Sequence, residues 1–242
     1  MRNYKDEFEN RVAFIKELLA KSGAKGILYG NSGGKDSALV GILCKAACEN
    51  TQGIILPCES KQNYTTDRDD AIAVADQFAI KTCTIDLTAQ KEQALKSLEG
   101  ATSLTSAAIS NIAPRLRMMT LYAVAASEGC MVAGTGNRSE RHMGYFTKWG
   151  DGACDFNPIS DLTATEVFEF LRYLDAPISI IQKPPSAGLY EGQTDEKEMG
   201  ITYRAIDEYL ESGKASQEDL AIIRRYHEGS AHKRDGVRFY AE

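Results

Sequence analysis

Hydrophobic and polar residues alternate along this chain in two rhythms. Short apolar runs at residues 26–29, 53–57, 82–86 and 130–134 predict four strands. Strands that alternate with helices favour an α/β fold, in which a parallel sheet carries helices on both faces. Apolar positions that recur every three or four residues predict helices at residues 4–22, 38–48, 65–78, 88–98, 111–128, 163–174, 202–210 and 216–226.

The long helix that begins at Asn111 illustrates how buried faces are predicted. Four apolar side chains form one stripe, three more widen it, and two arginines lie off it. The stripe is therefore wider than one core face needs, which leaves apolar surface for a second contact. The stripe consists of Ile112, Leu116, Met119 and Ala123. The residues that widen it are Met118, Leu121 and Tyr122, and the arginines off it are Arg115 and Arg117.

The turn between the first strand and the next helix carries the clearest sign of chemistry. It reads Ser-Gly-Gly-Lys-Asp-Ser from Ser32 to Ser37. A glycine-rich turn at this place aims backbone N–H groups and the positive helix end at an anion. It is not a Walker A loop, because Asp36 stands where that motif has Ser or Thr. A carboxylate beside an anion needs a cation between them, which predicts Mg²⁺ at Asp36; the alternative is an ordinary turn without ligand.

Composition and charge narrow the class of protein. The 242 residues and the absence of an obvious linker predict a single domain over residues 1–242. The formal net charge of −6 argues against a general nucleic-acid binder. No signal peptide or membrane-spanning run is visible, and six cysteines without Cys-x-x-Cys spacing fit reduced thiols, so a cytoplasmic protein without zinc is expected. Trp149, the single Trp, is expected to pack in the core.

The hexapeptide resembles the pyrophosphate loop of the N-type ATP pyrophosphatases, which cleave ATP between the α and β phosphates. Segments in the second half of the chain are similar to those of NAD⁺ synthetases, from about residue 10 to 235 overall. The resemblance implies a Rossmann-like sheet of the adenine nucleotide alpha hydrolase type. The segments begin at Gly134 (Gly-Thr-Gly-Asn-Arg-Ser-Glu), Gly144 (Gly-Tyr-Phe-Thr-Lys-Trp-Gly-Asp-Gly), Lys183 (Lys-Pro-Pro-Ser), Thr194 (Thr-Asp-Glu-Lys-Glu-Met-Gly) and His232 (His-Lys).

The resemblance implies a two-step reaction. ATP, the co-substrate, adenylates the nicotinate carboxylate of deamido-NAD⁺, and ammonia then displaces AMP to give NAD⁺, AMP and pyrophosphate. It also implies Mg²⁺ and a homodimer with deamido-NAD⁺ bound near the interface. Relatives that use glutamine carry an additional amidase domain with a Cys nucleophile. No cysteine of this chain has such a context, so free ammonia is the expected nitrogen source.

Site residues follow from matching positions. Taken alone, each has a plainer interpretation: a helix-surface charge for Arg117, solvated carboxylates or loop charges for several others. The resemblance assigns Gly30, Asn31, Ser32, Gly33, Gly34, Lys35, Asp36, Ser37, Thr135 and Ser186 to ATP, Asp36 and Glu140 to Mg²⁺, and Arg117, Lys148, Asp155, His232 and Lys233 to deamido-NAD⁺, with Asp36 and Lys183 as catalytic residues.

Two segments complicate this picture. Residues 182–197 form a polar loop rich in Pro and Gly, which predicts a lid that orders over ATP. Many members of the family have a basic ATP contact where this chain has Ala164, so Lys183 or Lys148 is expected to replace that charge, or the contact is weaker.

Three other functions stay open at this point. Another N-type pyrophosphatase, resembling a GMP synthetase module or a tRNA-modifying enzyme, shares the loop. The net negative charge counts against the tRNA enzyme. A nucleotide-binding sensor without catalysis is the third possibility, although a pure binder does not need two metal-binding carboxylates.

Overall fold

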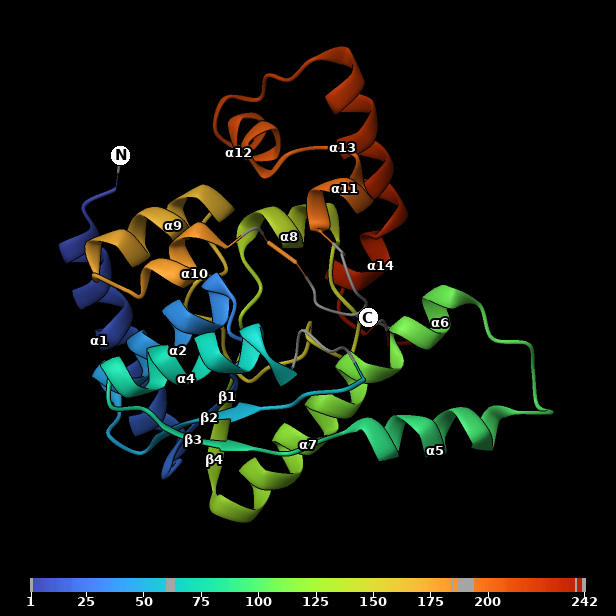
Figure 1. Cartoon of the computed structure of the whole chain (residues 1–242). Coiled ribbons are helices and arrows are strands. Elements are labelled where there is room, and N and C mark those ends of the chain that lie inside the picture. Colours follow the sequence, from blue (N-terminus) through green and yellow to red (C-terminus); the bar gives the residue numbers. More distant parts are fainter. Residues whose placement is uncertain (1, 60–63, 184, 187–193, 238, 241–242) are drawn as a thin grey trace.

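The structure is a computed structural model that describes residues 2–59, 64–183, 185–186, 194–237 and 239–240. Four parallel strands form its centre, in the order β3-β2-β1-β4 (Figure 1). Their bounds are Gly26–Gly30 (β1), Thr51–Ile55 (β2), Lys81–Thr84 (β3) and Cys130–Ala133 (β4). The predicted strands and parallel sheet are confirmed, although β2 and β3 begin and end slightly earlier than predicted.

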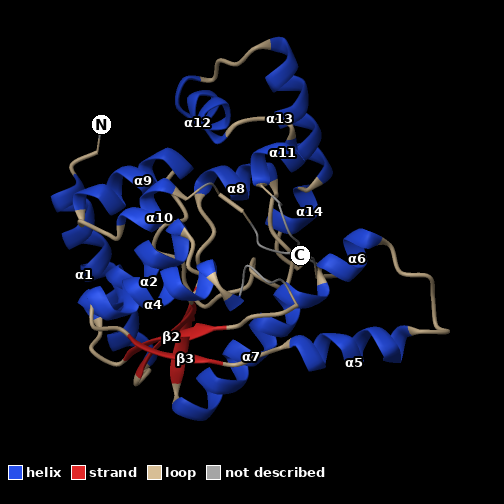
Figure 2. Ribbon diagram, viewed as in Figure 1, coloured by secondary structure: helices blue, strands red, loops and turns tan. Residues whose placement is uncertain are grey.

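Helices cover both faces of the sheet, as Figure 2 shows. On one face, α2 (Lys35–Ala47) and α4 (Thr66–Gln77) pack on the strands, and α1 (Tyr4–Ser22), α9 (Ala164–Tyr173) and α10 (Ile178–Gln182) pack against α2. The other face packs on α7 (Ile112–Glu128), beside which lie α5 (Thr88–Leu98) and α6 (Ser106–Ser110). Because both faces are covered, β1 and β2 are buried at consecutive residues rather than at every second one.

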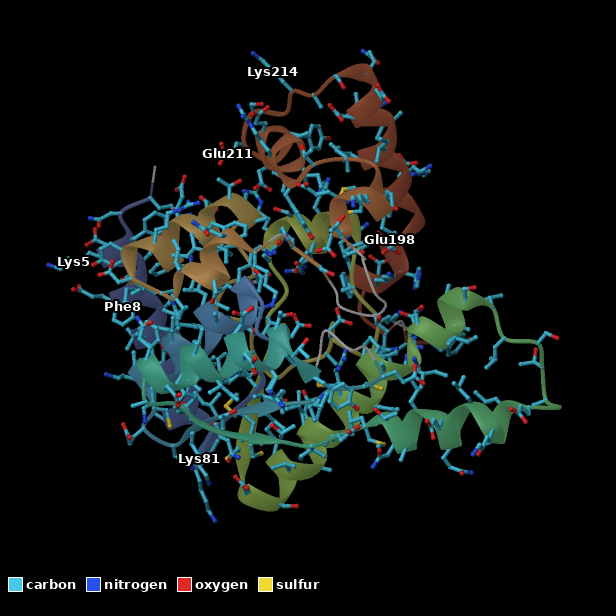
Figure 3. All side chains as sticks on the ribbon, viewed as in Figure 1. Lys5, Phe8, Lys81, Glu198, Glu211 and Lys214 are labelled. Carbon is cyan, nitrogen blue, oxygen red and sulfur yellow. The ribbon has the colours of Figure 1, made fainter. Side chains whose placement is uncertain are left out.

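A third apolar cluster builds the C-terminal part of the chain. It joins α8 (Arg138–Met143) to α11 (Asp195–Met199), α12 (Tyr203–Ser212) and α13 (Gln217–Gly229), and the short α14 (Ala231–Arg234) follows. Glu211 and Lys214 mark the end of this layer farthest from the sheet (Figure 3). The predicted helices 202–210 and 216–226 correspond to α12 and α13, whereas α6, α8, α10, α11 and α14 were not predicted.

The buried face of α7 differs from the predicted stripe. Its buried residues include Met118, Leu121 and Ala125, which pack under the sheet. Met119 is 60% exposed, so the predicted stripe through Met119 and Ala123 was wrong. The helix is apolar on more than one side, and its spacing alone does not identify the side that meets the sheet.

Trp149 is not a core residue. Its side chain is 59% exposed and its backbone is left-handed, with φ of 64°. The prediction that it packs in the core was therefore wrong. Within the predicted lid, residues 184 and 187–193 lie outside the described residues, so the lid stays a prediction. Among the described residues, no helix is both long and apolar enough to cross a membrane.

Tyr29 occupies the centre of the core, in β1. It is fully buried, and a Cβ at Gly41 or Gly53 would come within 2.3 or 2.9 Å of its side chain. The two glycines therefore make room for the phenol ring between α2 and β2. Its hydroxyl has no hydrogen-bond partner among the described residues. A buried hydroxyl without a partner adds desolvation cost and no stabilising bond.

We therefore expect Tyr29→Phe to leave the free energy of unfolding unchanged or to raise it by about 1 kcal/mol. Tyr29→Ala, the control for ring packing, should lower it by about 3–5 kcal/mol. Urea unfolding followed by circular dichroism measures both. A loss of more than about 2 kcal/mol in Tyr29→Phe would mean that the hydroxyl has a partner.

Candidate active site

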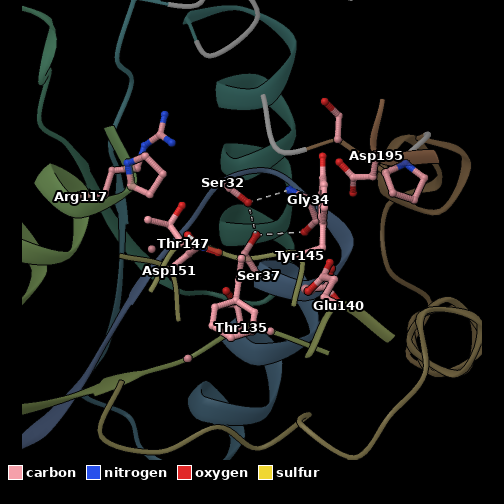
Figure 4. Close-up of a pocket in the computed structure, with 18 of the residues that line it drawn as sticks. Ser32, Gly34, Ser37, Arg117, Thr135, Glu140, Tyr145, Thr147, Asp151 and Asp195 are labelled. Carbon is pink, nitrogen blue, oxygen red and sulfur yellow. Dashed lines mark hydrogen bonds between the residues drawn. The ribbon is translucent and has the colours of Figure 1, made fainter. Parts of the chain in front are cut away.

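The glycine-rich turn joins β1 to α2 at the carboxyl edge of the sheet. Gly33 has φ of +70°, and a Cβ there would lie 2.0 Å from the carbonyl oxygen of Asp67 on α4. Only glycine fits this left-handed position against a neighbouring backbone. The hydroxyls of Ser32 and Ser37 share a hydrogen bond of 3.0 Å, and Ser37 also donates to the Gly34 carbonyl (Figure 4). The turn is thus locked ahead of the N-terminus of α2.

Two carboxylates lie around one ammonium beside this turn. The Lys35 Nζ is 2.5 Å from Asp36 Oδ2 and 3.7 Å from Glu140 Oε1. Burial and the neighbouring Asp36 raise the pKa of Glu140 above its usual range, whereas the Lys35 ammonium acts in the opposite direction. Burial alone would lower the pKa of Lys35, but the charges of Asp36 and Glu140 outweigh it and raise that pKa. The negative charge of Asp195, which is buried on α11, also raises the pKa of both Lys35 and Glu140.

Asn137 orients both carboxylates and was not predicted. Its side-chain Nδ2 donates to Asp36 Oδ1 at 3.0 Å. Its Oδ1 accepts from the Glu140 backbone N–H, and its own N–H donates to Glu140 Oε2 at 3.1 Å. This is the capping box of α8, so one fully buried amide ties the cap to the turn. An Asn three residues before a Glu is the sequence sign that reveals it.

A cavity of about 1090 Å³ opens in front of the turn. This is just above the range of about 300–1,000 Å³ that is usual for a single ligand, so the cavity suits more than one substrate. Most of the predicted site residues line it, whereas Gly33, Lys148, Asp155 and His232 do not. Those that line it are Gly30, Asn31, Ser32, Gly34, Lys35, Asp36, Ser37, Arg117, Thr135, Glu140, Lys183, Ser186 and Lys233.

The cavity has two ends of different character. Figure 4 shows Glu140 and Asp195 on one side of the turn, and Arg117, Thr147 and Asp151 on the other. Arg117 is half-buried, its Nε donates to the Leu56 carbonyl at 3.0 Å, and burial lowers its pKa. It is therefore a cation facing the cavity rather than an ordinary surface charge of the helix.

Lys233 forms part of the wall near this second end. Its ammonium donates to the carbonyls of Gly144 and Phe146, at 2.7 and 2.6 Å, and burial lowers its pKa. Asp151 lines the same cavity, accepts from the Thr147 N–H at 3.0 Å, and has a pKa raised by burial. Sequence reasoning did not assign Asp151 a role, because one Asp in a glycine-rich segment carries no periodic sign.

Lys183 lies at the entrance to the predicted lid. Its ammonium is 2.7 Å from Asp67 Oδ1 and 2.8 Å from Asp70 Oδ2, both on α4, and it donates to the Gly33 carbonyl. The lysine is thus already held next to the glycine-rich turn by two carboxylates that were not predicted.

The side chains of two predicted contacts with deamido-NAD⁺, Lys148 and Asp155, have other partners here, and a third predicted contact, His232, takes part through its backbone carbonyl. Lys148 donates to the carbonyl of His232 at 2.5 Å. Asp155 accepts from the Tyr122 hydroxyl and from the Val132 N–H of β4, which gives it a structural task at the sheet edge. Their roles toward the substrate stay predictions.

At Ala164, where many members of the family have a basic ATP contact, the structure has no charged side chain. Ala164 is buried and its N–H donates to the Ser139 hydroxyl. The candidates Lys183 and Lys148 have the partners described above. Lys35 lies over the ring of Phe168, one helical turn beyond Ala164, with its Nζ 5.7 Å from the ring centroid. It is therefore a cation on this side of α9 that sequence reasoning did not consider for this purpose.

The residues present fit a magnesium ion with further ligands. In the part of the chain that is described, no three His, Cys, Asp or Glu side chains gather to hold a metal by themselves. The carboxylates of Asp36 and Glu140, however, both contact the Lys35 ammonium, so their hard oxygen atoms lie close enough together to face one cation. Mg²⁺ commonly takes one or two carboxylates and completes its shell with water and phosphate oxygens.

The family model described as NAD synthase matches residues 7–235. The chain belongs to the NAD synthase family. A curated relative from Carboxydothermus hydrogenoformans, named NH(3)-dependent NAD(+) synthetase, is 46% identical over 235 residues, covering 96% of each chain.

Solved structures agree with this placement. The structure titled NMN synthetase, from Francisella tularensis, superposes with a TM-score of 0.94 at 37% identity and covers all of both chains. The NH3-dependent NAD synthetase of Campylobacter jejuni gives a TM-score of 0.81 at 28% identity, covering 99% of this chain and 100% of that one. The predicted fold, a Rossmann-like sheet of the adenine nucleotide alpha hydrolase type, is confirmed.

The helix that carries Glu140, α8, packs on α13 through a pair of histidines. His142 stacks on His227 of α13, with ring centroids 4.2 Å apart, and the His227 Nδ1 is 2.8 Å from the His142 carbonyl. Burial, followed by the nearby charges of His227, Arg234 and Arg138, lowers the pKa of His142 to about 4. His142 is therefore neutral in the folded protein at neutral pH.

This shift predicts a pH-dependent stability. Because the folded pKa lies below the unfolded value, the contribution is present above about pH 6.5 and is lost as pH falls toward 4. For a half-buried group screened by solvent, roughly 1 kcal/mol is expected. His142→Gln should flatten this part of the curve of unfolding free energy against pH, whereas the exposed control His232→Gln should leave it unchanged. Identical slopes for wild type and His142→Gln would contradict the prediction.

Proposed function

We infer that this chain is an ammonia-dependent NAD⁺ synthetase. It uses ATP to adenylate the nicotinate carboxylate of deamido-NAD⁺, and ammonia displaces AMP. The observation that carries this inference is the family match over residues 7–235 together with a 46% identical NH(3)-dependent relative along nearly the whole chain. The family placement also decides against a GMP synthetase-like or tRNA-modifying enzyme. Turnover, tested below, separates the synthetase from a non-catalytic sensor.

The chemistry explains why such an enzyme needs two anion sites. A carboxylate is a poor electrophile because its leaving group would be an oxide. In the first step a carboxylate oxygen bonds to the α-phosphorus of ATP, and the bond to the bridging oxygen breaks to release pyrophosphate. In the second step the ammonia lone pair attacks the acyl carbon and AMP leaves, while ammonia loses a proton. The protein must therefore hold two anions together and stabilise the charge that develops between them.

The glycine-rich turn is the proposed ATP end. Backbone N–H groups at the start of α2 suit phosphate oxygens, and Thr135 and Ser186 line the same cavity. Asp36 and Glu140 are the proposed holders of Mg²⁺, which when bound would neutralise phosphate charge. Lys183, beside the turn, is the proposed catalytic cation for the phosphates.

The other end is proposed for deamido-NAD⁺. Arg117 and Lys233 are cations in the cavity wall, and a dinucleotide carries two phosphates that need such partners. Lys148, Asp155 and His232 stay proposed contacts for the nicotinate half. They adjoin this end through the bond from Lys148 to His232 and through the position of His232 next to Lys233.

A second candidate substrate deserves a direct comparison. The Francisella tularensis structure of high similarity is titled NMN synthetase, and a mononucleotide presents the same nicotinate carboxylate. If this chain were an NMN synthetase, nicotinate mononucleotide would be amidated faster than deamido-NAD⁺. The cavity of about 1090 Å³ favours the larger dinucleotide.

The proposed function predicts the products and the nitrogen source. With ATP, Mg²⁺, ammonium and deamido-NAD⁺, the purified protein should form NAD⁺, AMP and pyrophosphate in equal amounts, as mass spectrometry can measure. Because only neutral ammonia carries a lone pair, the rate at fixed total ammonium should rise with pH through neutrality. Glutamine in place of ammonium should give no NAD⁺. Faster turnover of nicotinate mononucleotide would favour the second candidate, and no turnover of either would favour the sensor.

The carboxylate pair allows a sharper test. Asp36→Asn and Glu140→Gln keep the shape of each side chain and remove its charge, so both should lower kcat by at least about 100-fold. The matched control Glu59→Gln changes a carboxylate that is paired with Lys91 outside the cavity, and its kcat should stay near that of the wild type. Circular dichroism verifies the fold. Near-normal turnover of Asp36→Asn would refute the proposed metal site.

A homodimer is also proposed, and exposed apolar side chains support it. Met119 and Trp149 are 60% and 59% exposed, and Arg115, one turn before Met119, donates to the Lys148 carbonyl. Both therefore belong to the outer side of α7 and its neighbouring segment. A single domain over residues 1–242 and a cytoplasmic location stay predictions.

We expect Met119→Lys to shift the protein from dimer to monomer in analytical ultracentrifugation at micromolar concentration, because it places a charge in an apolar contact. Ile178→Lys, the control at a similarly exposed apolar residue on α10, should remain dimeric. A wild-type protein that is monomeric at this concentration and fully active would refute the dimer.

A further inference from the structure

The ammonium of Lys35 is enclosed rather than free to swing into the cavity. The side chain is 5% exposed. Its Nζ lies 5.4 Å from the ring centroid of Tyr203 and 5.7 Å from that of Phe168, so aromatic faces from α12 and α9 flank it. Aromatic faces attract a cation but accept no salt bridge, which leaves the carboxylates as its strongest partners.

Those partners are the proposed metal ligands themselves. Lys35 Nζ is 2.5 Å from Asp36 Oδ2 and 3.7 Å from Glu140 Oε1. A single positive charge is thus shared by two carboxylates that are 16% and 17% exposed and would otherwise repel each other at short range. Asn137 holds the same two side chains by hydrogen bonds, but an uncharged amide does not neutralise them.

A divalent cation that uses the same oxygens must share them with this ammonium. Repulsion between two cations at such short distances in a buried site is strong. The phosphates of ATP would add negative charge and oxygen ligands, and so would offset that repulsion. Without nucleotide, no phosphate charge offsets this repulsion, and the Lys35 ammonium remains the cation paired with Asp36 and Glu140.

We propose that Lys35 is the resident counter-cation of the Asp36–Glu140 pair, and that it keeps the affinity for a divalent metal low until a nucleotide binds. Lys35 is then a positioning residue and not primarily a phosphate ligand. This inference rests on the proposed function only through the metal site, and its test uses neither deamido-NAD⁺ nor turnover.

The test is Mn²⁺ binding to the nucleotide-free protein, followed by electron paramagnetic resonance of the free ion. Lys35→Gln removes the charge, and its Mn²⁺ affinity should be about tenfold or more above that of the wild type. Lys91→Gln is the matched control, because Lys91 is equally buried but pairs with Glu59 outside the cavity. Its Mn²⁺ affinity should equal that of the wild type. Adding a nonhydrolysable ATP analogue should tighten Mn²⁺ binding more in the wild type than in Lys35→Gln.

Thermal unfolding gives a second reading of the same variants. In EDTA, Lys35→Gln should unfold at a lower temperature than the wild type, and Mn²⁺ should restore more of its stability than it adds to the wild type. If Lys35→Gln does not fold even with Mn²⁺, Lys35→Arg decides. That variant keeps the charge, so its Mn²⁺ affinity should be within about twofold of the wild type, and a tenfold rise would overturn the proposal.

The opposite outcome is equally clear. Mn²⁺ affinity of Lys35→Gln equal to or below that of the wild type, with weaker binding of the ATP analogue in EDTA, would make Lys35 a phosphate ligand and overturn the proposal. If neither protein binds Mn²⁺ even with the analogue, the metal site fails and the inference fails with it. The proposed synthetase reaction is tested separately, by the assay of NAD⁺, AMP and pyrophosphate.

Discussion

Partly buried negative charge is the constraint around which this molecule is arranged. Asp36, Glu140 and Asp195 come from three helices distant in sequence, and each helps to set the charge state of its neighbours. Such a group persists in a folded protein only if cations and hydrogen-bond donors compensate for it. Lys35 and Asn137 supply these partners. The folded chain thus holds a site that attracts more positive charge, as an enzyme that handles ATP requires.

The parallel sheet makes this concentration of charge possible. β1 and β4 are neighbours, with Tyr29 opposite Ala133, so the turn after β1 and the segment after β4 leave the sheet at the same edge. Asp36 follows the first and Glu140 the second. The C-terminal helices contribute to the cavity wall, since Asp195 at the start of α11 lines it and accepts from Tyr203 of α12 at 2.9 Å. Elements that appear peripheral in Figure 1 therefore complete the site.

Sequence reasoning predicted what local patterns encode. The strands follow from apolar runs, and the glycine-rich turn is contiguous, so its residues and its place before α2 were predictable. Asn137 and Asp195 were not assigned, because α8 and α11 span six and five residues and are too short to show a helical period. The buried face of α7 was misassigned because apolar residues occupy more than one of its sides. Burial there is decided by what packs against the helix, which the local pattern does not contain.

Lys183 is held beside the glycine-rich turn by charges on α4. α4 approaches the glycine-rich turn so closely that the Asp67 carbonyl excludes any side chain at Gly33, and Asp67 and Asp70 of the same helix hold Lys183. The helix that packs against the turn, α4, therefore also supplies the two carboxylates that pair with Lys183. A triphosphate in the cavity would present a greater negative charge to Lys183 than two single carboxylates do. Because Lys183 already donates to the Gly33 carbonyl, it lies beside the turn that is proposed to bind such a triphosphate.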